Sequence, residues 1–600
     1  MQLSPLPDLA SGRRLIWTAL GVTLIVSVVL AWHDADLGKA LGDTDDAMRL
    51  VLVRDLLSGR GWWDQLAPRL QPPLGSYMHW SRLVDGGLAA MTWTFGRFLS
   101  PQAAELATRL VWPLMWIFPA VLSALAVARS LAGRTAVFVC AVLLATNVQL
   151  YTQFRPGRVD HHNIQIAMTL VAAACAMARA DRARWAALAG AAAGLGLAVG
   201  IEALAFQAII GASFAMRAVM NPEEDAKPAW AYALALVAAT LGFYALQTPP
   251  WRWSLSVCDS IGFNLVTAVT VGGLGLAALT RVGLGSDVGG RLVALGGVGI
   301  LSAGAYLALD PACIHGPFAA VDPRMGPFWF SHIRELQSWP KMLVQDPGVA
   351  VRSIVMALMA VAAGGVLLFH ERVRPRPETL LACACVALAA AAAAQALRMQ
   401  DYAYWFGVPM LAAAIAIVGA RYLRGLLLPT LAATLAASPV VVGVALSLLV
   451  EMAPKPAIAA TVGVDERCFD TANYAPLAAL PRGLVLAEID LGPFILANTG
   501  DSVLAAPYHR MSWGILAAHD AEGSPTGVAE AKVRALNVAY LVECPTNPLR
   551  VGPASLEADV RAGRAPVWLQ PLSKPGQTLQ IYRVLPRSAS GPRPASPPGR

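Results

Sequence analysis

Long apolar runs recur along most of this chain and limit what it can fold into. A helix crosses the hydrocarbon core of a membrane with about 17 to 25 apolar residues, and runs of this length return between residues 14 and 450. Hydrophobic residues make up 56% of the chain and charged residues only 14%, more apolar surface than a soluble core can bury. We therefore predict a mainly α-helical, polytopic membrane protein with about thirteen spans at 14–32, 104–128, 134–151, 163–179, 185–201, 203–217, 229–247, 261–280, 291–309, 350–370, 379–397, 403–420 and 425–450.

The basic residues indicate which ends of the spans lie in the cytoplasm. Arginines concentrate in the short loops between alternate spans, as the positive-inside rule requires, so the net charge of +8 does not indicate a nucleic-acid partner. With Arg13 and Arg14 in the cytoplasm, an odd number of spans places the other loops and the C-terminal region on the outer face. This face then carries most of the unusual polar sequence, in loops 33–103, 152–162 and 310–349 and after about residue 451.

The chain changes character after a membrane domain predicted over residues 1–450. Short β-type runs such as "GLVLAEI", "DSVLAA", "VAYLVE" and "LQIYRV" alternate with Ala-rich helical patterns. They predict a soluble α/β domain over 455–586 on the outer face. This polar region contains Cys468 and Cys544, which are candidates for a disulfide. Four other cysteines lie inside apolar runs. Residues 587–600 are rich in Pro, Ser, Gly and Arg, which predicts a disordered tail.

An aspartate cluster follows the first span in "LGDTDDAMRLVLVRDLL" (41–57). Asp43, Asp45 and Asp46 stand ahead of a helical pattern, where carboxylates cap a helix and interact favourably with its dipole. Capping alone is one interpretation. Three aspartates within four residues exceed what a cap needs, and a cation would relieve their repulsion.

A second polar motif, "GRVDHHNIQ" (157–165), lies in the turn between the third and fourth spans. Asp160 and His162 are two residues apart, so both can face one ion on a turn, while His161 points elsewhere. A carboxylate with a neutral imidazole suits Mn²⁺ or Mg²⁺, and Mn²⁺ tolerates the nitrogen ligand better. The alternative is an interfacial, hydrogen-bonded histidine pair.

The third acidic position is Glu335, beside aromatic residues in "FWFSHIRELQSWP" (328–340) of the longest outer loop between spans. A solvated interfacial helix is the alternative interpretation of this stretch. Arg398, at the outer end of the eleventh span, either extends its charged end to the membrane surface or holds a phosphate. All of these groups are predicted on one face.

The order of these motifs resembles that of a known family. The catalytic subunits of oligosaccharyltransferases are C-type membrane glycosyltransferases that use polyprenyl-phosphate-linked sugars, with thirteen spans and a soluble C-terminal domain on the outer face. Their first outer loop carries an aspartate motif before a helix, which "DDAMRLVLVRD" (45–55) matches best at Asp45 and next best at Asp46. Over about residues 10 to 450, the chain looks like a divergent bacterial member.

The remaining motifs of the family have counterparts in the other outer loops. Its Asp-x-Asp or Asp-x-His pair before the fourth span matches Asp160 and His162. Its Thr/Ser-Ile-x-Glu motif is similar to "HIRELQ" (332–337), which keeps Ile333 and Glu335 and lacks the hydroxyl residue. Arg398 resembles an arginine near the start of the late spans of the family.

The resemblance implies transfer of a sugar or oligosaccharide from a polyprenyl-phosphate-linked donor, at the outer face of a bacterial inner membrane with a periplasmic C-terminal domain. A divalent cation, Mn²⁺ or Mg²⁺, would neutralise the leaving phosphate. The partners implied are the donor, membrane lipid and an acceptor glycan, lipid or protein. The roles implied are catalysis by Asp45, Asp46 and Glu335, metal binding by Asp45, Asp160 and His162, and substrate binding by Arg398, His161, Trp80 and Arg54.

One departure leaves the acceptor open. The family holds the Ser or Thr of its acceptor sequon with a Trp-Trp-Asp-x-Gly motif in the C-terminal domain, and no such run follows residue 455. The run "WWDQ" at 62–65 lies in the first outer loop instead. Protein N-glycosylation therefore does not follow from the resemblance.

Two other classes of protein remain as alternatives. A transporter or flippase is expected to show ionisable residues near the middle of its spans or paired broken helices. The predicted spans are almost free of charge, with Arg109 early in the second and Glu202 at a boundary. A non-catalytic scaffold would require all the acidic motifs to be incidental.

Overall fold

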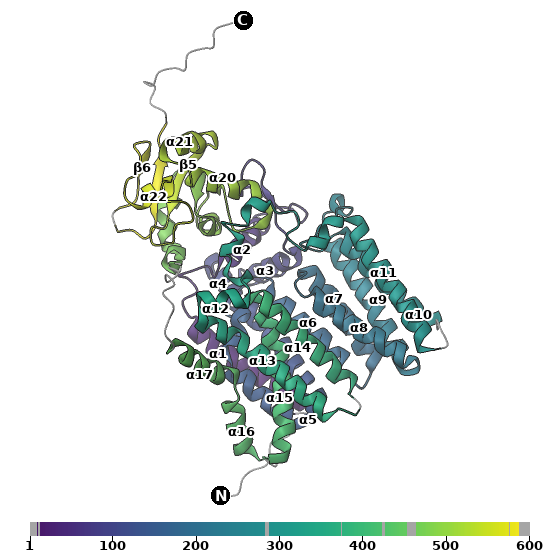
Figure 1. The fold of residues 1–600 in the computed structure, drawn as a ribbon. Coiled ribbons are helices and arrows are strands. Elements are labelled where there is room, and N and C mark those ends of the chain that lie inside the picture. Colours follow the sequence, from purple (N-terminus) through teal and green to yellow (C-terminus); the bar gives the residue numbers. More distant parts are fainter. Residues whose placement is uncertain are drawn as a thin grey trace.

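The computed structural model describes residues 9, 12–282, 287–373, 375–422, 426–452, 464–574 and 576–586. Within these residues the protein is mainly helical, with a small sheet near the C-terminus (Figure 1). Nine helices of this part are long and apolar enough to cross a membrane. The protein is therefore a multi-pass membrane protein with about nine candidate spans, since apolar helices such as His162–Ala176 and Leu204–Met220 are shorter. The predicted tail, 587–600, lies outside the described residues.

The helices of the membrane part form two groups below the C-terminal sheet. In Figure 1, α7 to α11 form one group, while α1, α5 and α13 to α17 lie in the other. Their bounds are α1 Gly12–His33, α4 Pro101–Met115, α5 Ile117–Thr146, α6 His162–Ala176, α7 Arg182–Val199, α8 Leu204–Met220, α9 Pro222–Gln247, α10 Phe263–Val282, α11 Val288–Leu309, α13 Pro347–His370, α14 Pro377–Gln395, α15 Gln400–Tyr422, α16 Leu427–Ala436 and α17 Pro439–Glu451. The connecting segments form α2 Thr44–Leu57, α3 Arg82–Phe95, α12 Trp339–Gln345 and the pair β1 Leu66–Ala67 and β2 Ser76–Tyr77.

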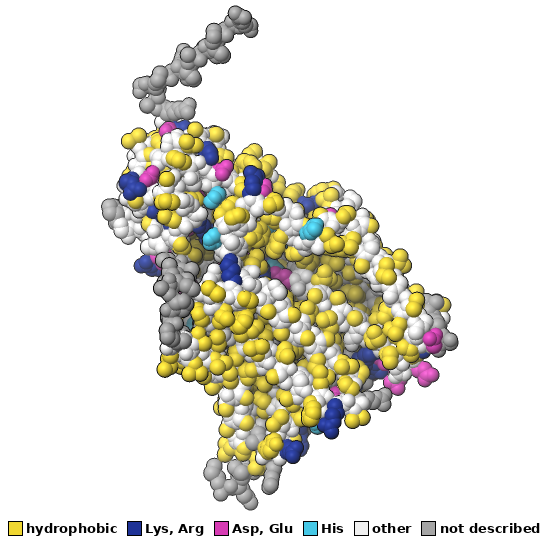
Figure 2. Space-filling view, viewed as in Figure 1, with side chains coloured by type: hydrophobic (Ala, Val, Ile, Leu, Met, Phe, Trp, Pro, Cys, Tyr) yellow, Lys and Arg dark blue, Asp and Glu magenta, His cyan; other side chains and the backbone are white. Residues whose placement is uncertain are grey.

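The candidate spans differ in how much of their apolar surface other helices cover. The most apolar window of the segment that contains α15 is 78% buried, whereas that of α11 is not buried at all. A helix that is hydrophobic all round needs either a protein core or lipid around it. Figure 2 shows hydrophobic side chains over the sides of the helical part. We conclude that α15 is central to its group, whereas α11 packs against α10 through residues such as Ser302 and leaves its other faces to lipid.

Small residues let α7 and α9 pack closely. A Cβ on Gly190 would lie 2.3 Å from the backbone oxygen of Tyr232, and one on Gly194 would lie 2.7 Å from the Cβ of Ala239. This four-residue spacing of glycines is typical of membrane helix pairs, because backbones without side chains between them gain van der Waals contact. The pair holds the end of α7 and its following loop, which carries Glu202, against the rest of the membrane part.

The C-terminal region forms a mixed five-stranded sheet in the order β4-β3-β5-β7-β6. Strand β3 is parallel to β4 and β5, while β7 is antiparallel to β5 and β6. The four predicted β-type runs coincide with β3, β4, β5 and β7, and β6 was not predicted. The bounds are β3 Leu484–Ala487, β4 Ser502–Val503, β5 Val538–Glu543, β6 Leu569–Pro571 and β7 Gln580–Val584, with helices α18 Ala475–Ala478, α19 Gly492–Asn498, α20 Ser512–Glu522, α21 Thr526–Ala535 and α22 Leu556–Arg561.

The first outer loop packs into this C-terminal region and shares one hydrophobic core with it. The Arg69 guanidinium donates to the backbone oxygens of Leu496, Thr499 and Asp501, at 3.0 to 3.1 Å. Residue Leu70 forms a β-bridge with Val503 of β4. The sheet is therefore fixed against the loop that carries the aspartate cluster.

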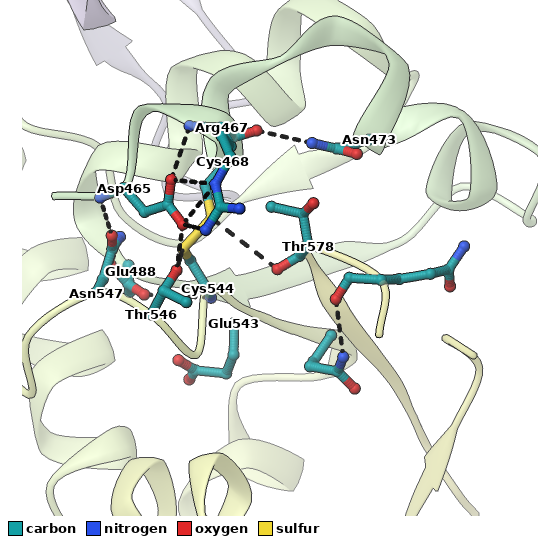
Figure 3. Close-up of a disulfide and its surroundings, with 12 residues drawn as sticks. Asp465, Arg467, Cys468, Asn473, Glu488, Glu543, Cys544, Thr546, Asn547 and Thr578 are labelled. Atoms are coloured by element: carbon teal, nitrogen blue, oxygen red, sulfur yellow. Dashed lines mark hydrogen bonds and ion pairs between the residues drawn. A yellow bond between two sulfur atoms is a disulfide. The ribbon is translucent and has the colours of Figure 1, made fainter. Parts of the chain in front are cut away.

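Two disulfides connect polar segments outside the membrane helices. One joins Cys468 to Cys544, the two cysteines that the sequence offers in the C-terminal region (Figure 3). The other joins Cys258 to Cys313, in the connections after α9 and α11, and sequence reasoning missed it.

Removal of the Cys468–Cys544 disulfide is expected to destabilise the C-terminal region by about 2 to 5 kcal/mol, because the bond closes a long loop in the unfolded chain. The loop spans a sequence separation of 76. Hydrogen exchange of the β5 amides in the full chain with Cys468→Ser and Cys544→Ser measures this loss. The variant Cys383→Ser, at a free cysteine of α14, serves as the control. Equal protection in the double variant and the control would contradict the prediction.

Buried glutamates surround one arginine beneath the sheet. Arg561 lies 2.8 Å from Glu488, 3.3 Å from Glu543 and 2.6 Å from Glu557. Glu522 adds a further carboxylate that is 7% exposed. Burial and then the neighbouring carboxylates raise the pKa of Glu522 and of Glu543 well above the ordinary value.

The stability of the C-terminal region is therefore expected to fall as the pH rises. A carboxyl whose pKa is raised by folding stabilises fully below the unfolded value of about 4.3, and this contribution is lost as the pH rises through the folded value. The limiting slope is about 1.4 kcal/mol per pH unit for each group. Hydrogen exchange at pH 5.5, 6.5 and 7.5 measures the slope, and Glu522→Gln is expected to flatten it. A variant with the slope of the wild type would contradict this assignment.

Candidate active site

Helix α2 begins with a capping box that uses two of the three clustered aspartates. The Asp43 carboxylate accepts hydrogen bonds from the amides of Asp45 and Asp46, both at 3.0 Å, and the Asp43 amide donates to Asp46 at 3.2 Å. The cap thus accounts for Asp43 and Asp46. Within the described residues, no group donates a hydrogen bond to the side chain of Asp45, which lines a large cavity. The repulsion predicted from the sequence therefore concentrates on Asp45.

Asp46 connects this helix start to the turn that holds the second motif. Its carboxylate is fully buried and accepts hydrogen bonds from the amides of Val159, at 2.7 Å, and Asp160, at 3.0 Å. It also lies 2.9 Å from the guanidinium of Arg158. Two motifs more than a hundred residues apart in the sequence are thereby held side by side.

Asp160 is the centre of a buried polar network. Its carboxylate lies 3.1 Å from Arg49, 2.7 Å from His161 and 3.1 Å from His162. Arg49 in turn contacts Asp85 at 2.8 Å and has no exposed side-chain surface. The ligand atoms of Asp160, His161 and His162 all lie within 4.8 Å of one another.

Arg398 joins the late helices to this network. Its guanidinium lies 2.8 Å from Glu202, 3.2 Å from Glu335 and 2.5 Å from the Nε2 atom of His162. Four predicted motifs therefore converge at one place, together with Glu202, which sequence reasoning treated only as a boundary residue. The sequence feature that could have identified Glu202 is a carboxylate at the outer end of a predicted span.

Electrostatics distinguishes the two aspartates that face each other here. Burial raises the pKa of Asp45 well above its ordinary value, and the negative charges of Asp160, Asp43 and Glu335 raise it further. Burial acts in the same direction on Asp160, but His161 and His162 hold the pKa of this carboxyl well below its ordinary value. A cation between the two carboxylates would relieve the repulsion on Asp45.

The cavity beside these groups has a volume of about 1430 Å³ and reaches from the membrane helices to the C-terminal region. Figure 2 shows the surface hollowed between these two parts. Pockets for small molecules commonly have volumes of about 300 to 1,000 Å³, so this cavity can admit more than one small group.

The predicted site residues fall into three sets by position. Those that line the cavity are Asp45, Trp80, His161, Glu335 and Arg398. Asp160 and His162 lie directly behind the lining and contact its residues His161, Glu202 and Arg398. Asp46 and Arg54 are not part of the lining, and Arg54 instead pairs with Glu105 at 2.7 Å.

Sequence comparison does not identify this chain, because no family model and no curated protein match it. Solved structures do match its fold. The archaeal oligosaccharyltransferase AglB from Archaeoglobus fulgidus, solved with an inhibitory peptide and a dolichol-phosphate, aligns with a TM-score of 0.63 and 14% identity over 88% of this chain and 69% of that chain. The oligosaccharyltransferase of the same organism in complex with Zn and sulfate aligns with a TM-score of 0.59 and 14% identity, over 96% of this chain and 74% of that chain.

A third structure of the Archaeoglobus fulgidus enzyme, tethered to an acceptor peptide containing an NVT sequon, gives a TM-score of 0.62 at 14% identity over 88% and 69% of the two chains. Similarity at this identity concerns the fold. The expected mainly helical, multi-pass fold with a small C-terminal sheet is thus confirmed, whereas the count of thirteen spans is not. The chain has the fold of this archaeal oligosaccharyltransferase.

Proposed function

We propose that this protein is a membrane glycosyltransferase that moves a sugar or oligosaccharide from a polyprenyl-phosphate-linked donor to an acceptor. One observation carries the proposal. The Asp45 carboxylate lines the cavity while the capping box occupies Asp43 and Asp46, and Asp160, Arg398 and Glu335 converge beside it. A free carboxylate next to an arginine suits a reaction in which a phosphate leaves and a nucleophile enters.

The proposed topology has thirteen passes and a cavity that opens to the extracytoplasmic face of a bacterial inner membrane. The segment Pro101–Thr146 has 46 residues, about 69 Å at about 1.5 Å per residue, more than twice the hydrocarbon core of about 30 Å. Its helix is broken at Ala132 and Gly133, where the φ angle of Gly133 is 69°. We infer two passes there, and single passes for the shorter helices α6, α7 and α8.

The residues present fit a divalent cation. No group donates a hydrogen bond to the Asp45 carboxylate in the described part of the chain, and the ligand atoms of Asp160, His161 and His162 lie within 4.8 Å of one another. Asp45, Asp160 and His162 would supply two carboxylates and an imidazole, donors that suit Mn²⁺ and, less well, Mg²⁺. When bound, such a cation would neutralise the charge that develops on the leaving phosphate.

The surrounding side chains have separate proposed roles. Arg398 holds a donor phosphate, since Glu202 and Glu335 already orient its guanidinium. Glu335 lies on the long outer loop and can accept a proton from the acceptor. Trp80 and His161 line the path of the substrates.

Two residues outside the lining have positioning roles in this proposal. The Asp46 carboxylate holds the 158–160 turn through the amides of Val159 and Asp160. Arg54 fixes α2 against Ala497 of the C-terminal region.

Calorimetry with Mn²⁺ on the full chain in nanodiscs tests the cation site. The wild type is expected to bind Mn²⁺, and Asp45→Asn is expected to weaken binding at least tenfold. The matched control is Asp64→Asn, in the same outer loop with a side chain that is 59% exposed, and it is expected to bind as the wild type does. Absent binding by the wild type, or equal binding by both variants, would remove the metal from the proposal.

A further inference from the structure

A row of rings in mutual contact lines the cavity next to Asp45, with neighbouring ring planes inclined at 52° to 81°. The ring centroids of successive members lie 4.5 to 5.6 Å apart. Three separate segments contribute them: the first outer loop, the long outer loop and the C-terminal region. From the Asp45 end outward, this ring wall consists of Tyr508, Trp80, His79, His509, Phe318 and Phe330, all of which line the cavity.

The ring wall is anchored at two points. The Tyr508 hydroxyl donates to the backbone oxygen of Thr44 at 2.9 Å, directly before Asp45. At the fourth ring, Asp259 lies 2.6 Å from His509 and 2.6 Å from Arg510. Asp259 adjoins the Cys258–Cys313 disulfide. The rings are therefore held in place before any ligand arrives, which lowers the entropy cost of binding.

Two members of the ring wall are imidazoles, which can form hydrogen bonds. The Nδ1 atom of His79 is buried and has no hydrogen-bond partner within the described residues. Burial, and then the charges of His509 and Arg510, lower the pKa of His79 well below its ordinary value. A neutral imidazole has one donor and one acceptor nitrogen, so an imidazole in the cavity lining can both donate and accept a hydrogen bond.

We infer that the ring wall binds a saccharide acceptor and presents one of its hydroxyl groups to the Asp45 site. This inference rests on the proposed transferase function and names the acceptor class that the function leaves open. The ring of a sugar has faces of carbon-bound hydrogens, which pack on aromatic rings, and a rim of hydroxyl groups that need hydrogen-bond partners. The rings supply the packing surface, and the carboxylates of Asp45 and Glu335 in the same cavity lining can accept hydrogen bonds from the hydroxyl groups.

A peptide acceptor fits this cavity less well. An extended peptide is commonly held by backbone hydrogen bonds to an exposed strand edge. None of the described strands β1 to β7 contributes a residue to the cavity lining. The C-terminal region also lacks a Trp-Trp-Asp run after residue 455.

The transfer step balances without a redox partner. The acceptor oxygen forms a new bond to the anomeric carbon of the donor sugar while the bond from that carbon to the phosphate oxygen breaks. The electron pair leaves with the polyprenyl phosphate, and the acceptor proton passes to a carboxylate, Asp45 or Glu335.

Binding to immobilised probes tests the acceptor class. The full chain in nanodiscs is applied to an array of neutral, amino-sugar and uronic-acid oligosaccharides printed beside peptides that contain Asn, Ser or Thr. The variant Phe318→Ala removes a half-exposed ring, and His79→Phe keeps a ring but removes its nitrogens. The control, Trp513→Ala, alters an exposed aromatic residue of α20 that does not line the cavity.

The wild type and Trp513→Ala are expected to bind at least one oligosaccharide class, with at least tenfold weaker binding by Phe318→Ala and His79→Phe. Binding of peptides instead of saccharides, or no saccharide binding, would overturn the inference and leave the transferase proposal standing. Saccharide binding unchanged in both ring-wall variants would also overturn it. Cleavage of polyprenyl-phosphate sugars in water by the wild type is measured separately. If that cleavage fails while saccharide binding depends on the ring wall, the transferase proposal falls and the binding site remains.

Discussion

Substitution of Asp45 by Asn is expected to lower the kcat for sugar transfer by about 10²- to 10³-fold, the usual loss when one group that stabilises developing charge is removed. Asn keeps the size of the side chain but removes the negative charge. The capping box that starts α2 uses Asp43 and Asp46 instead, so the fold should be retained. The release of polyprenyl phosphate from a labelled donor measures kcat.

The control for this prediction is Asp64→Asn, which removes a carboxylate from the same outer loop at a position outside the cavity lining. It is expected to keep the wild-type kcat. Full activity of Asp45→Asn, with Mn²⁺ and donor both saturating, would show that the free carboxylate is not part of the reaction.

Substitution of Arg398 by Gln is expected to raise the KM for the donor about tenfold or more. A hydrogen bond to a charged group contributes about 1.5 to 3 kcal/mol, and Gln cannot reproduce the two-pronged contact of a guanidinium with a phosphate. The substitution also leaves Glu202 and Glu335 without their shared partner, which adds to the loss. Initial rates over a range of donor concentrations separate KM from kcat.

The matched control is Arg324→Gln, on the same long outer loop as Glu335, where the arginine side chain is 74% exposed and pairs with Asp322. Its KM is expected to equal that of the wild type. An Arg398→Gln enzyme with unchanged KM would exclude the proposed phosphate contact.

The sequence was sufficient to predict which motifs lie close together, because each combines charged residues with the boundary of an apolar run. Asp45, Asp160, Glu335 and Arg398 were singled out in this way, and their side chains converge. The C-terminal strands could be predicted as well, since "VAYLVE" and "LQIYRV" are short, apolar and bounded by turn residues.

The sequence spacing did not predict which of the three aspartates caps α2 and which lines the cavity. Which of them caps α2 depends on the backbone of residue 43, whose φ of −111° and ψ of −169° orient the side chain toward the following amides. Because spacing does not distinguish the three aspartates, the sequence also made Asp46 a catalytic candidate. In the structure its carboxylate accepts hydrogen bonds from the amides of Val159 and Asp160.

Contacts between segments distant in the chain could not be predicted from the sequence either. The pairing of Cys258 with Cys313 joins two loops separated by a helix pair, and no spacing rule connects them. The ring wall combines residues from three loops that come together only through packing of the first outer loop against the C-terminal sheet. The span count differs for a related reason, since Pro101–Thr146 forms one long helical segment and predicted spans such as 163–179 and 203–217 form shorter helices.

The most direct test of the central claim is a cleavage assay in proteoliposomes loaded with a polyprenyl-phosphate donor whose sugar is radiolabelled. Release of polyprenyl phosphate and movement of intact donor across the bilayer are measured on the same sample, with Mn²⁺ present. Our account predicts cleavage of the bond between sugar and phosphate by the wild type, strongly reduced in Asp45→Asn. Movement of intact donor across the bilayer without any cleavage would contradict it and indicate a flippase.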